Sequence, residues 1–268
     1  MATAGEVRRH PTIQVLGRAG MVCYGVVHVL LAVLTAQVVF GDAGEQTDQK
    51  GAVALVAQTP FGPVLLWVLA IGLFAFAVWQ AGLAVSGYTW VPDEKKRWLR
   101  RIGAGTRAVT GVAIGIAAIT YAVGSSSSSS DEQQQTLTGR LLELPAGPFL
   151  VGAVGLAVIG IGFAVARKGV KKKFEDDLDM GELPIGARRW VERSGQVGWV
   201  GKGIAYGVIG VLVGLAAVTH DPSQSGGMDK ALHTLAAQPY GVFVLAVVAL
   251  GFLGFAVFSF AAAKAHHS

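Results

Sequence analysis

The sequence predicts an all-α, polytopic membrane protein with six transmembrane helices, arranged as three parallel two-helix repeats with pseudo-threefold symmetry. Two observations predict this fold: long stretches without charge, and a unit that occurs three times. Of the 268 residues, 52% are hydrophobic and 15% are charged, whereas soluble proteins have about 25% charged residues. Asp, Glu, Lys and Arg are absent from residues 51–92 and 231–263. Both stretches exceed the ~20 residues that a helix needs to cross a bilayer.

The repeated unit consists of two apolar segments, each announced by its own small-residue pattern. The first segments align at Gly20, Gly25 and His28; at Gly103, Ala108 and Gly111; and at Gly198, Gly203 and Tyr206. The second segments follow Pro60-Phe61-Gly62, Pro145-Ala146-Gly147 and Pro239-Tyr240-Gly241. Because each repeat crosses the membrane twice, all three repeats enter it in the same direction. The repeats are therefore expected to be parallel, about an axis along the membrane normal.

The chain divides into seven parts on this basis. We expect a cytoplasmic tail at 1–16, repeat 1 at 17–86, a basic cytoplasmic linker at 87–102, repeat 2 at 103–168, a charged cytoplasmic linker at 169–196, repeat 3 at 197–264 and a tail at 265–268. The membrane helices should span about 17–40, 63–86, 103–123, 147–166, 197–219 and 240–263. Short helices on the outer surface are expected at 52–57, 137–144 and 229–237. The polar run of Ser125–Ser130 and Gln133–Gln135 predicts no ordered structure.

The distribution of Lys and Arg sets the orientation. Only Lys50, Arg140 and Lys230 fall on one side of the predicted topology, whereas the tail and the two long linkers on the other side hold most of the basic residues. Since basic loops stay in the cytoplasm, both termini are expected to be cytoplasmic. The net charge of +5 is explained by these loops, and no nucleic-acid partner is expected.

These residues carry a resemblance to a known family. The threefold two-helix unit, with Gly-x4-Gly-x2-Tyr or His opening one helix and Pro-aromatic-Gly opening the next, resembles the actinobacterial membrane proteins grouped as domain of unknown function family 1206. The resemblance covers nearly the whole chain, from Gly17 to Phe260. It implies a bacterial plasma-membrane protein built from three such units, and it supplies no activity.

Five intramembrane polar residues are the candidate site. Arg107 and Lys202 occupy aligned positions; they either line an anion path or extend to the cytoplasmic headgroups. His28 either relays protons, with Gln80 close by, or forms an interhelical hydrogen bond. Tyr206 is the counterpart of His28 in the third repeat.

The sequence indicates no chemistry beyond these residues. We expect no catalytic residues, no cofactor and no metal site, because His220, Asp221 and His233 lack a ligand spacing. The leading interpretation is therefore a non-enzymatic structural or accessory membrane component, whose partners are membrane lipids and other membrane proteins. The second interpretation is a small transporter or channel with a path along the repeat axis, whose substrate the sequence does not identify.

Overall fold

The computed structural model describes residues 11–41, 46–89, 91–125, 129–178, 181 and 183–265. Six long helices in this part of the chain are apolar enough to cross a membrane. They are α2 (Pro11–Phe40), α4 (Gly62–Ser86), α5 (Glu94–Ala122), α7 (Gly147–Val170), α8 (Ile185–Thr219) and α10 (Gly241–Ala265). The predicted all-α fold with six candidate spans is confirmed, and the protein is a multi-pass membrane protein.

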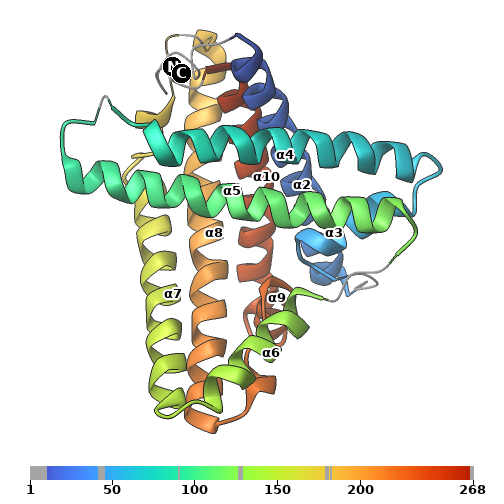
Figure 1. Ribbon diagram of the computed structural model, residues 1–268, viewed down its shortest axis with the longest axis vertical. Coiled ribbons are helices and arrows are strands. Elements are labelled where there is room, and N and C mark those ends of the chain that lie inside the picture. Colours follow the sequence, from blue (N-terminus) through green and yellow to red (C-terminus); the bar gives the residue numbers. More distant parts are fainter. Residues whose placement is uncertain are drawn as a thin grey trace.

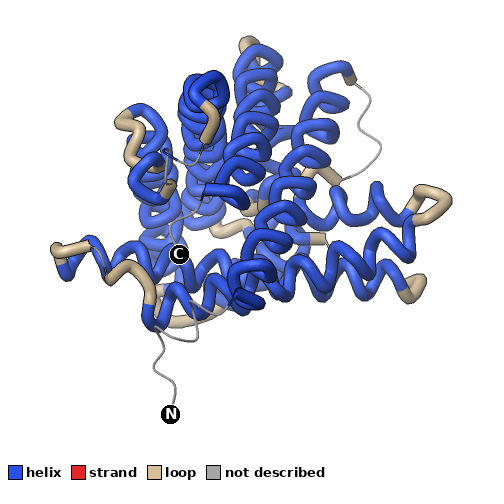
Figure 2. The backbone as a smooth tube through the Cα atoms, turned by 90° about the horizontal axis from the view of Figure 1, so that it is seen from above, coloured by secondary structure: helices blue, strands red, loops and turns tan. Residues whose placement is uncertain are grey.

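Short helices separate the two long helices of each repeat. They are α3 (Gln49–Ala57), α6 (Ser130–Leu142) and α9 (Met228–Ala236), and two 3-10 helices, η1 (Glu175–Asp177) and η3 (Pro222–Gln224), lie in loops. The described chain is helical apart from short connections (Figure 2). In Figure 1, α6 and α9 lie at the opposite end of α8 and α10 from the chain ends.

The glycine of each Pro-x-Gly motif has a specific packing role. A Cβ atom at Gly62 would meet the carbonyl oxygens of Val56 and Ala57, at the end of α3. The same clash would occur at Gly147 with the end of α6, and at Gly241 with the end of α9. Each short helix therefore ends directly against the backbone of the long helix that follows. Only glycine allows this approach, and the motif recurs for that reason.

The long helices contact one another both between repeats and within them. The most extensive contacts join different repeats, at the α4/α5, α7/α8 and α10/α2 pairs, which we term the between-repeat seams. Within repeats, α2 packs on α4 and α8 packs on α10, whereas no comparable contact joins α5 and α7 in the described residues. The neighbours are therefore ordered α5, α4, α2, α10, α8, α7, as a ring that is open between its two ends.

Equivalent residues meet at the between-repeat seams. A Cβ atom at Gly25 would come within 2.6 Å of Phe260, and one at Gly203 within 2.7 Å of Ala166. The third pair is Ala108 with Ala81, which line one groove between α4 and α5. Ala81, Ala166 and Phe260 each lie 21 residues after a motif proline. In Figure 1, α4 and α5 run across α7 and α8.

The first helices begin earlier than the sequence analysis expected. They start at Pro11, Glu94 and Ile185, and not at residues 17, 103 and 197. For α5 the reason is local, because the Asp93 carboxylate accepts a hydrogen bond from the Lys96 backbone N–H at 3.1 Å. This side chain caps the helix, so the expected basic linker is in large part a helical extension that carries its cations beyond the apolar span.

One expectation about order was wrong. Gln133–Gln135, predicted to lack structure, lie inside α6. The physical reason is a capping box, in which the Ser129 hydroxyl accepts from the Glu132 backbone N–H at 2.9 Å and the Glu132 carboxylate accepts from the Ser129 N–H at 3.1 Å. Two N–H groups that a helix start leaves unpaired are thereby satisfied. The neighbouring residues 126–128 lie outside the described part of the chain.

Candidate functional site

Three residues at equivalent positions of the repeats come together in the core. Tyr24, Arg107 and Lys202 each precede the aligned residue Gly25, Ala108 or Gly203, on the first helix of each repeat. The Lys202 ammonium Nζ lies 3.5 Å from the Tyr24 hydroxyl Oη, and Arg107 and Tyr24 line the same cavity. Since equivalent positions converge only near a symmetry axis, this cluster marks the pseudo-threefold axis, and we term it the axial cluster.

Lys202 is held inside the protein. Its side chain is buried, and Nζ lies 3.8 Å from the centroid of the Phe255 ring, a distance typical of a cation–π contact. Lys202 therefore does not extend to the headgroups, which was one of the two interpretations of this residue. The Arg107 guanidinium donates a hydrogen bond to the Tyr88 hydroxyl at 3.1 Å.

His28 lies one turn deeper on α2 and is almost completely buried. Its Nε2 is 3.3 Å from Lys202 Nζ, and its Nδ1 is 2.8 Å from the Tyr24 carbonyl oxygen. Because an ammonium group only donates, Nε2 must accept, so the proton is assigned to Nδ1, which donates to the carbonyl. Both ring nitrogens of a neutral His28 are thereby satisfied. This arrangement favours a structural hydrogen bond between α2 and α8 over proton relay.

A small cavity of about 50 Å³ lies beside the axial cluster. Its walls come from α2, α4, α5, α8 and α10 and from the loop at Tyr88. Aromatic rings form much of the lining, in particular Phe76, Phe255, Phe258 and Trp199. The cavity is therefore shared by repeats 1 and 3 and by the first helix of repeat 2, whereas α7 contributes none of its lining.

Three polar atoms around this cavity are buried and have no hydrogen-bond partner. They are the Gln80 carbonyl oxygen Oε1, Arg107 Nε and the indole Nε1 of Trp199. An unpaired buried polar group costs about 1–3 kcal/mol, so three beside one cavity are unusual. No Asp or Glu of the described chain lines the cavity. The arrangement has two cations without a carboxylate, two unpaired donors and one unpaired acceptor, and it can hold an anion.

The structure gathers most of the sequence-predicted residues. Gln80 and Arg107 line the cavity, whereas Lys202 and His28 contact each other behind its lining residue Tyr24. Tyr206 is one turn beyond Lys202 and packs against the core, but it is not part of the lining.

Sequence reasoning missed three further residues: Tyr24, Tyr88 and Trp199. A signal for Tyr24 existed, since it occupies the position that Arg107 and Lys202 hold in the other repeats. Trp199 likewise aligns with Met21, which also lines the cavity. Tyr88 lies in a loop outside the repeated pattern, and the sequence offered no signal for it.

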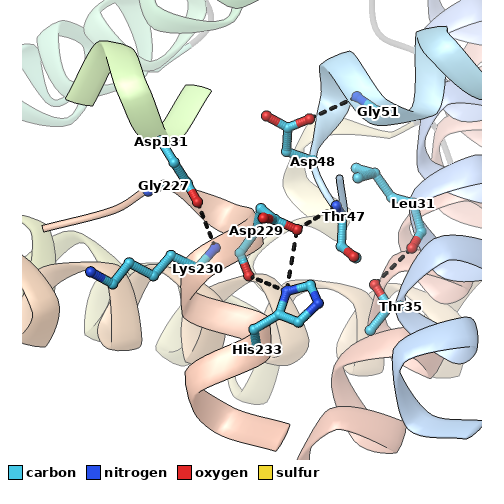
Figure 3. A network of polar contacts seen from close by, with 10 residues as sticks. All are labelled: Leu31, Thr35, Thr47, Asp48, Gly51, Asp131, Gly227, Asp229, Lys230 and His233. Atoms are coloured by element: carbon cyan, nitrogen blue, oxygen red, sulfur yellow. Dashed lines mark hydrogen bonds and ion pairs between the residues drawn. The ribbon is translucent and has the colours of Figure 1, made fainter. Parts of the chain in front are cut away.

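A second polar cluster joins the short helices on the other side (Figure 3). The Asp131 carboxylate of α6 accepts from the backbone N–H groups of Gly227 at 2.6 Å and Lys230 at 3.0 Å, at the start of α9. In the same way, Asp229 of α9 accepts from the Thr47 N–H at 2.6 Å, just before α3. We term these contacts the outer hub. Each carboxylate neutralises the start of the next repeat's short helix.

The outer hub is not arranged as a metal site. His233 Nδ1 lies 3.3 Å from the Asp229 carboxylate. In the described residues, no group of three or more His, Cys, Asp or Glu side chains is positioned to hold an ion. The described side chains of the outer hub therefore act on backbone N–H groups and on one another.

Comparison with known families agrees with the threefold pattern. The profile described as "Domain of Unknown Function (DUF1206)" matches three separate segments, residues 19–87, 102–172 and 197–266. The chain belongs to the DUF1206 family. The resemblance inferred from the glycine motifs is thus confirmed.

A similar protein from another bacterium carries no activity in its name. The chain is 28% identical over 249 residues to the "Uncharacterized protein YxxB" of Bacillus subtilis (strain 168), which covers 93% of this chain and 90% of the relative. No solved structure matches the chain at a significant level. The axial cavity is therefore interpreted from its own geometry.

Proposed function

We propose that this protein is a small, non-enzymatic carrier or channel for an anion, with a path along the repeat axis. The observation that supports it most is the pair Arg107 and Lys202, held at equivalent positions beside a buried cavity without a carboxylate counter-charge. Intramembrane cations are costly and usually mark a ligand or ion pathway. An anion in the cavity would offset both charges and would also pair with the donors Arg107 Nε and Trp199 Nε1.

The state described is closed on the outer side of the cavity. Along α2 after His28, Leu31, Leu34 and Thr35 are almost completely buried. The Thr35 hydroxyl donates to the Leu31 carbonyl at 2.7 Å, so it offers no polar path to the outer hub. Passage would require movement between the cavity and the outer hub, as in alternating access.

The proposal includes location and partners. We place the protein in a bacterial plasma membrane, with both termini cytoplasmic, because the basic residues concentrate on that side of the repeats. Membrane lipids are its surroundings and nucleic acid is not a partner. The cavity then lies nearer the cytoplasmic end of α2, α5 and α8, and its anion enters from the cytoplasm.

Flux measurements test the proposal directly. The full chain is reconstituted into liposomes, and the efflux of small inorganic and carboxylate anions is followed under a valinomycin-driven potential. We expect flux above that of empty liposomes, reduced at least tenfold in Arg107→Gln and Lys202→Met. Arg140→Gln, an exposed cation on α6, is the matched control and should transport normally. Wild-type protein that is folded yet passes no anion would overturn the proposal.

The open ring favours a second candidate, a structural or accessory subunit. The α5 and α7 helices lack the mutual contact that the other repeats make, and much of the α7 surface is exposed. A helix of another membrane protein that packs there would complete the ring. Affinity purification in mild detergent distinguishes the candidates, because a stoichiometric partner supports the accessory role.

A further inference from the structure

An open groove of about 480 Å³ on the α10/α2 seam combines apolar walls with two cations. The cations are Arg18 and Lys264, and the apolar residues of the described lining are Val15, Ala19, Val22, Phe260 and Ala263. We propose that this groove binds an anionic phospholipid, with the phosphate at Arg18 and Lys264 and an acyl chain along the apolar residues. The groove shares no lining residue with the axial cavity, so the proposal is independent of the anion path.

The two cations lie at the depth of lipid headgroups. Arg18 is the second residue of the apolar span that begins at Gly17, and Lys264 is the last residue of the span that begins at Gly241. Both line the same groove, so the start of one span and the end of the other meet at one membrane boundary. Basic side chains at such a boundary attract anionic lipids.

The charge of this groove lacks a protein counter-charge. Both cationic side chains are exposed, and neither belongs to an ion pair of the described chain. The described lining of the groove contains no Asp or Glu. A guanidinium binds a phosphate through two parallel hydrogen bonds, and a lysine adds a point charge. A lipid phosphate is therefore the complementary group.

The apolar part of the groove extends from the cations into the membrane. Val22 and Phe260 each lie four residues further into their span than the cation of the same helix, which is about 6 Å along a helix. Their side chains are 43% and 38% exposed. The lining residues Ala19 and Ala263 are small, so they leave room for an acyl chain next to the headgroup site.

The other two seams do not repeat this pair of cations. The positions equivalent to Arg18 and Lys264 are Arg101 and Val85 at the α4/α5 seam, and Gln196 and Val170 at the α7/α8 seam. The α4/α5 seam has a groove of similar volume, about 470 Å³, whose described lining is entirely apolar. The protein therefore contains its own control, a groove of the same size without the charge.

Native mass spectrometry of the full chain tests the headgroup site. The protein is released from micelles that hold equal amounts of phosphatidylglycerol and phosphatidylcholine with the same acyl chains. We expect one retained phosphatidylglycerol, preferred by about fivefold for each cation. The double variant Arg18→Gln/Lys264→Gln should lose this preference, and each single variant should lose about fivefold.

A second double variant separates the groove from general electrostatic attraction. Lys171→Gln/Lys173→Gln removes the same charge from exposed residues just after α7 and should keep the preference. Arg18→Lys should keep most of it as well. An unchanged preference in the single and double variants at Arg18 and Lys264, or an equal loss in Lys171→Gln/Lys173→Gln, would overturn the proposal.

A filled groove tests the acyl chain. Ala19→Leu leaves both cations in place and should weaken the retention of phosphatidylglycerol severalfold. Ala113→Leu, at an exposed alanine of the α4/α5 groove, is the matched control and should have no effect. Glycerol 3-phosphate, which carries the phosphate without acyl chains, should not displace the lipid. Displacement by glycerol 3-phosphate, or full retention in Ala19→Leu, would show that the cations bind a free phosphate and would refute the lipid site.

Discussion

Gly198 permits a prediction about stability, because the room around its Cβ position decides whether alanine stabilises or destabilises the protein. A Cβ atom at this position on α8 would lie 2.6 Å from the backbone nitrogen and 2.8 Å from the Cα of Phe255 on α10. Its equivalent in repeat 1 is Gly20, whose Cβ would lie 2.6 Å from the Cα of Phe76 on α4. Backbone atoms on both sides cannot rotate away, so alanine requires the helices to separate.

The expected magnitude follows from two opposing effects. Alanine in place of glycine favours a helix by roughly 1 kcal/mol, whereas forcing a methyl group into a packed interface costs roughly 1–3 kcal/mol. Because the neighbours of Gly198 are backbone atoms, we take the upper part of that range and expect a net loss of roughly 1–2 kcal/mol. Gly214, also on α8, has nothing within 4 Å of its Cβ position, so Gly214→Ala should be neutral or stabilising by up to about 1 kcal/mol.

The single cysteine provides the assay. Cys23 is the sole thiol of the chain and is partly buried on α2, so a thiol-reactive fluorogenic dye reports unfolding on heating in detergent. We expect the order of melting temperatures to be Gly214→Ala at or above wild type, and Gly198→Ala and Gly20→Ala below it. If Gly198→Ala melts with Gly214→Ala, the close helix approach inferred from the glycines is incorrect.

Three further predictions concern the polar residues and the topology. His28→Gln should lower the melting temperature less than His28→Ala, since an amide retains a donor and an acceptor and such bonds average about 0.6 kcal/mol in membranes; equal losses would argue against a hydrogen-bonding role. Partial burial raises the pKa of the Asp131 carboxyl, so its contribution to stability is present at low pH and is lost as the pH rises through the folded-state pKa. Because the amide nitrogen of an asparagine cannot accept from the Lys230 N–H, Asp131→Asn should melt below wild type, by a smaller margin at pH 7 than at pH 4; a larger margin at pH 7 would contradict this sign. In a cysteine-free background, Gln224→Cys should react with an impermeant thiol reagent on intact cells and Lys95→Cys should not; the opposite labelling would invert the topology.

The sequence was sufficient for the parts of the fold that depend on local pattern. The uncharged stretches predicted the spans, and the Pro-x-Gly motifs located the starts of α4, α7 and α10, because an apolar helix and its turn are encoded by neighbouring residues. The earlier start of α5 and the order of α6 depended on single capping side chains, Asp93 and Ser129. Composition alone does not reveal these, since the same residues are also common in loops.

The candidate site was only partly predictable for a different reason. Aligning the repeats placed Arg107 and Lys202 at equivalent positions, but it did not show that Tyr24 would meet them. That contact depends on α10 packing against α2, which brings the last repeat next to the first. Likewise, the unpaired oxygen of Gln80 becomes meaningful only when its surroundings are known. Long-range packing, and not local pattern, determines which polar groups share the cavity.

The α10/α2 seam joins the last helix of the chain to the first without any peptide connection between them. The α4/α5 seam makes an equivalent contact with a connection of only residues 87–93. The order of repeats along the polypeptide is therefore separable from their order around the axis. A permuted gene that encodes repeats 2, 3 and 1 would specify the same three seams. By the same logic, three copies of a single two-helix repeat should be able to form these seams between separate chains.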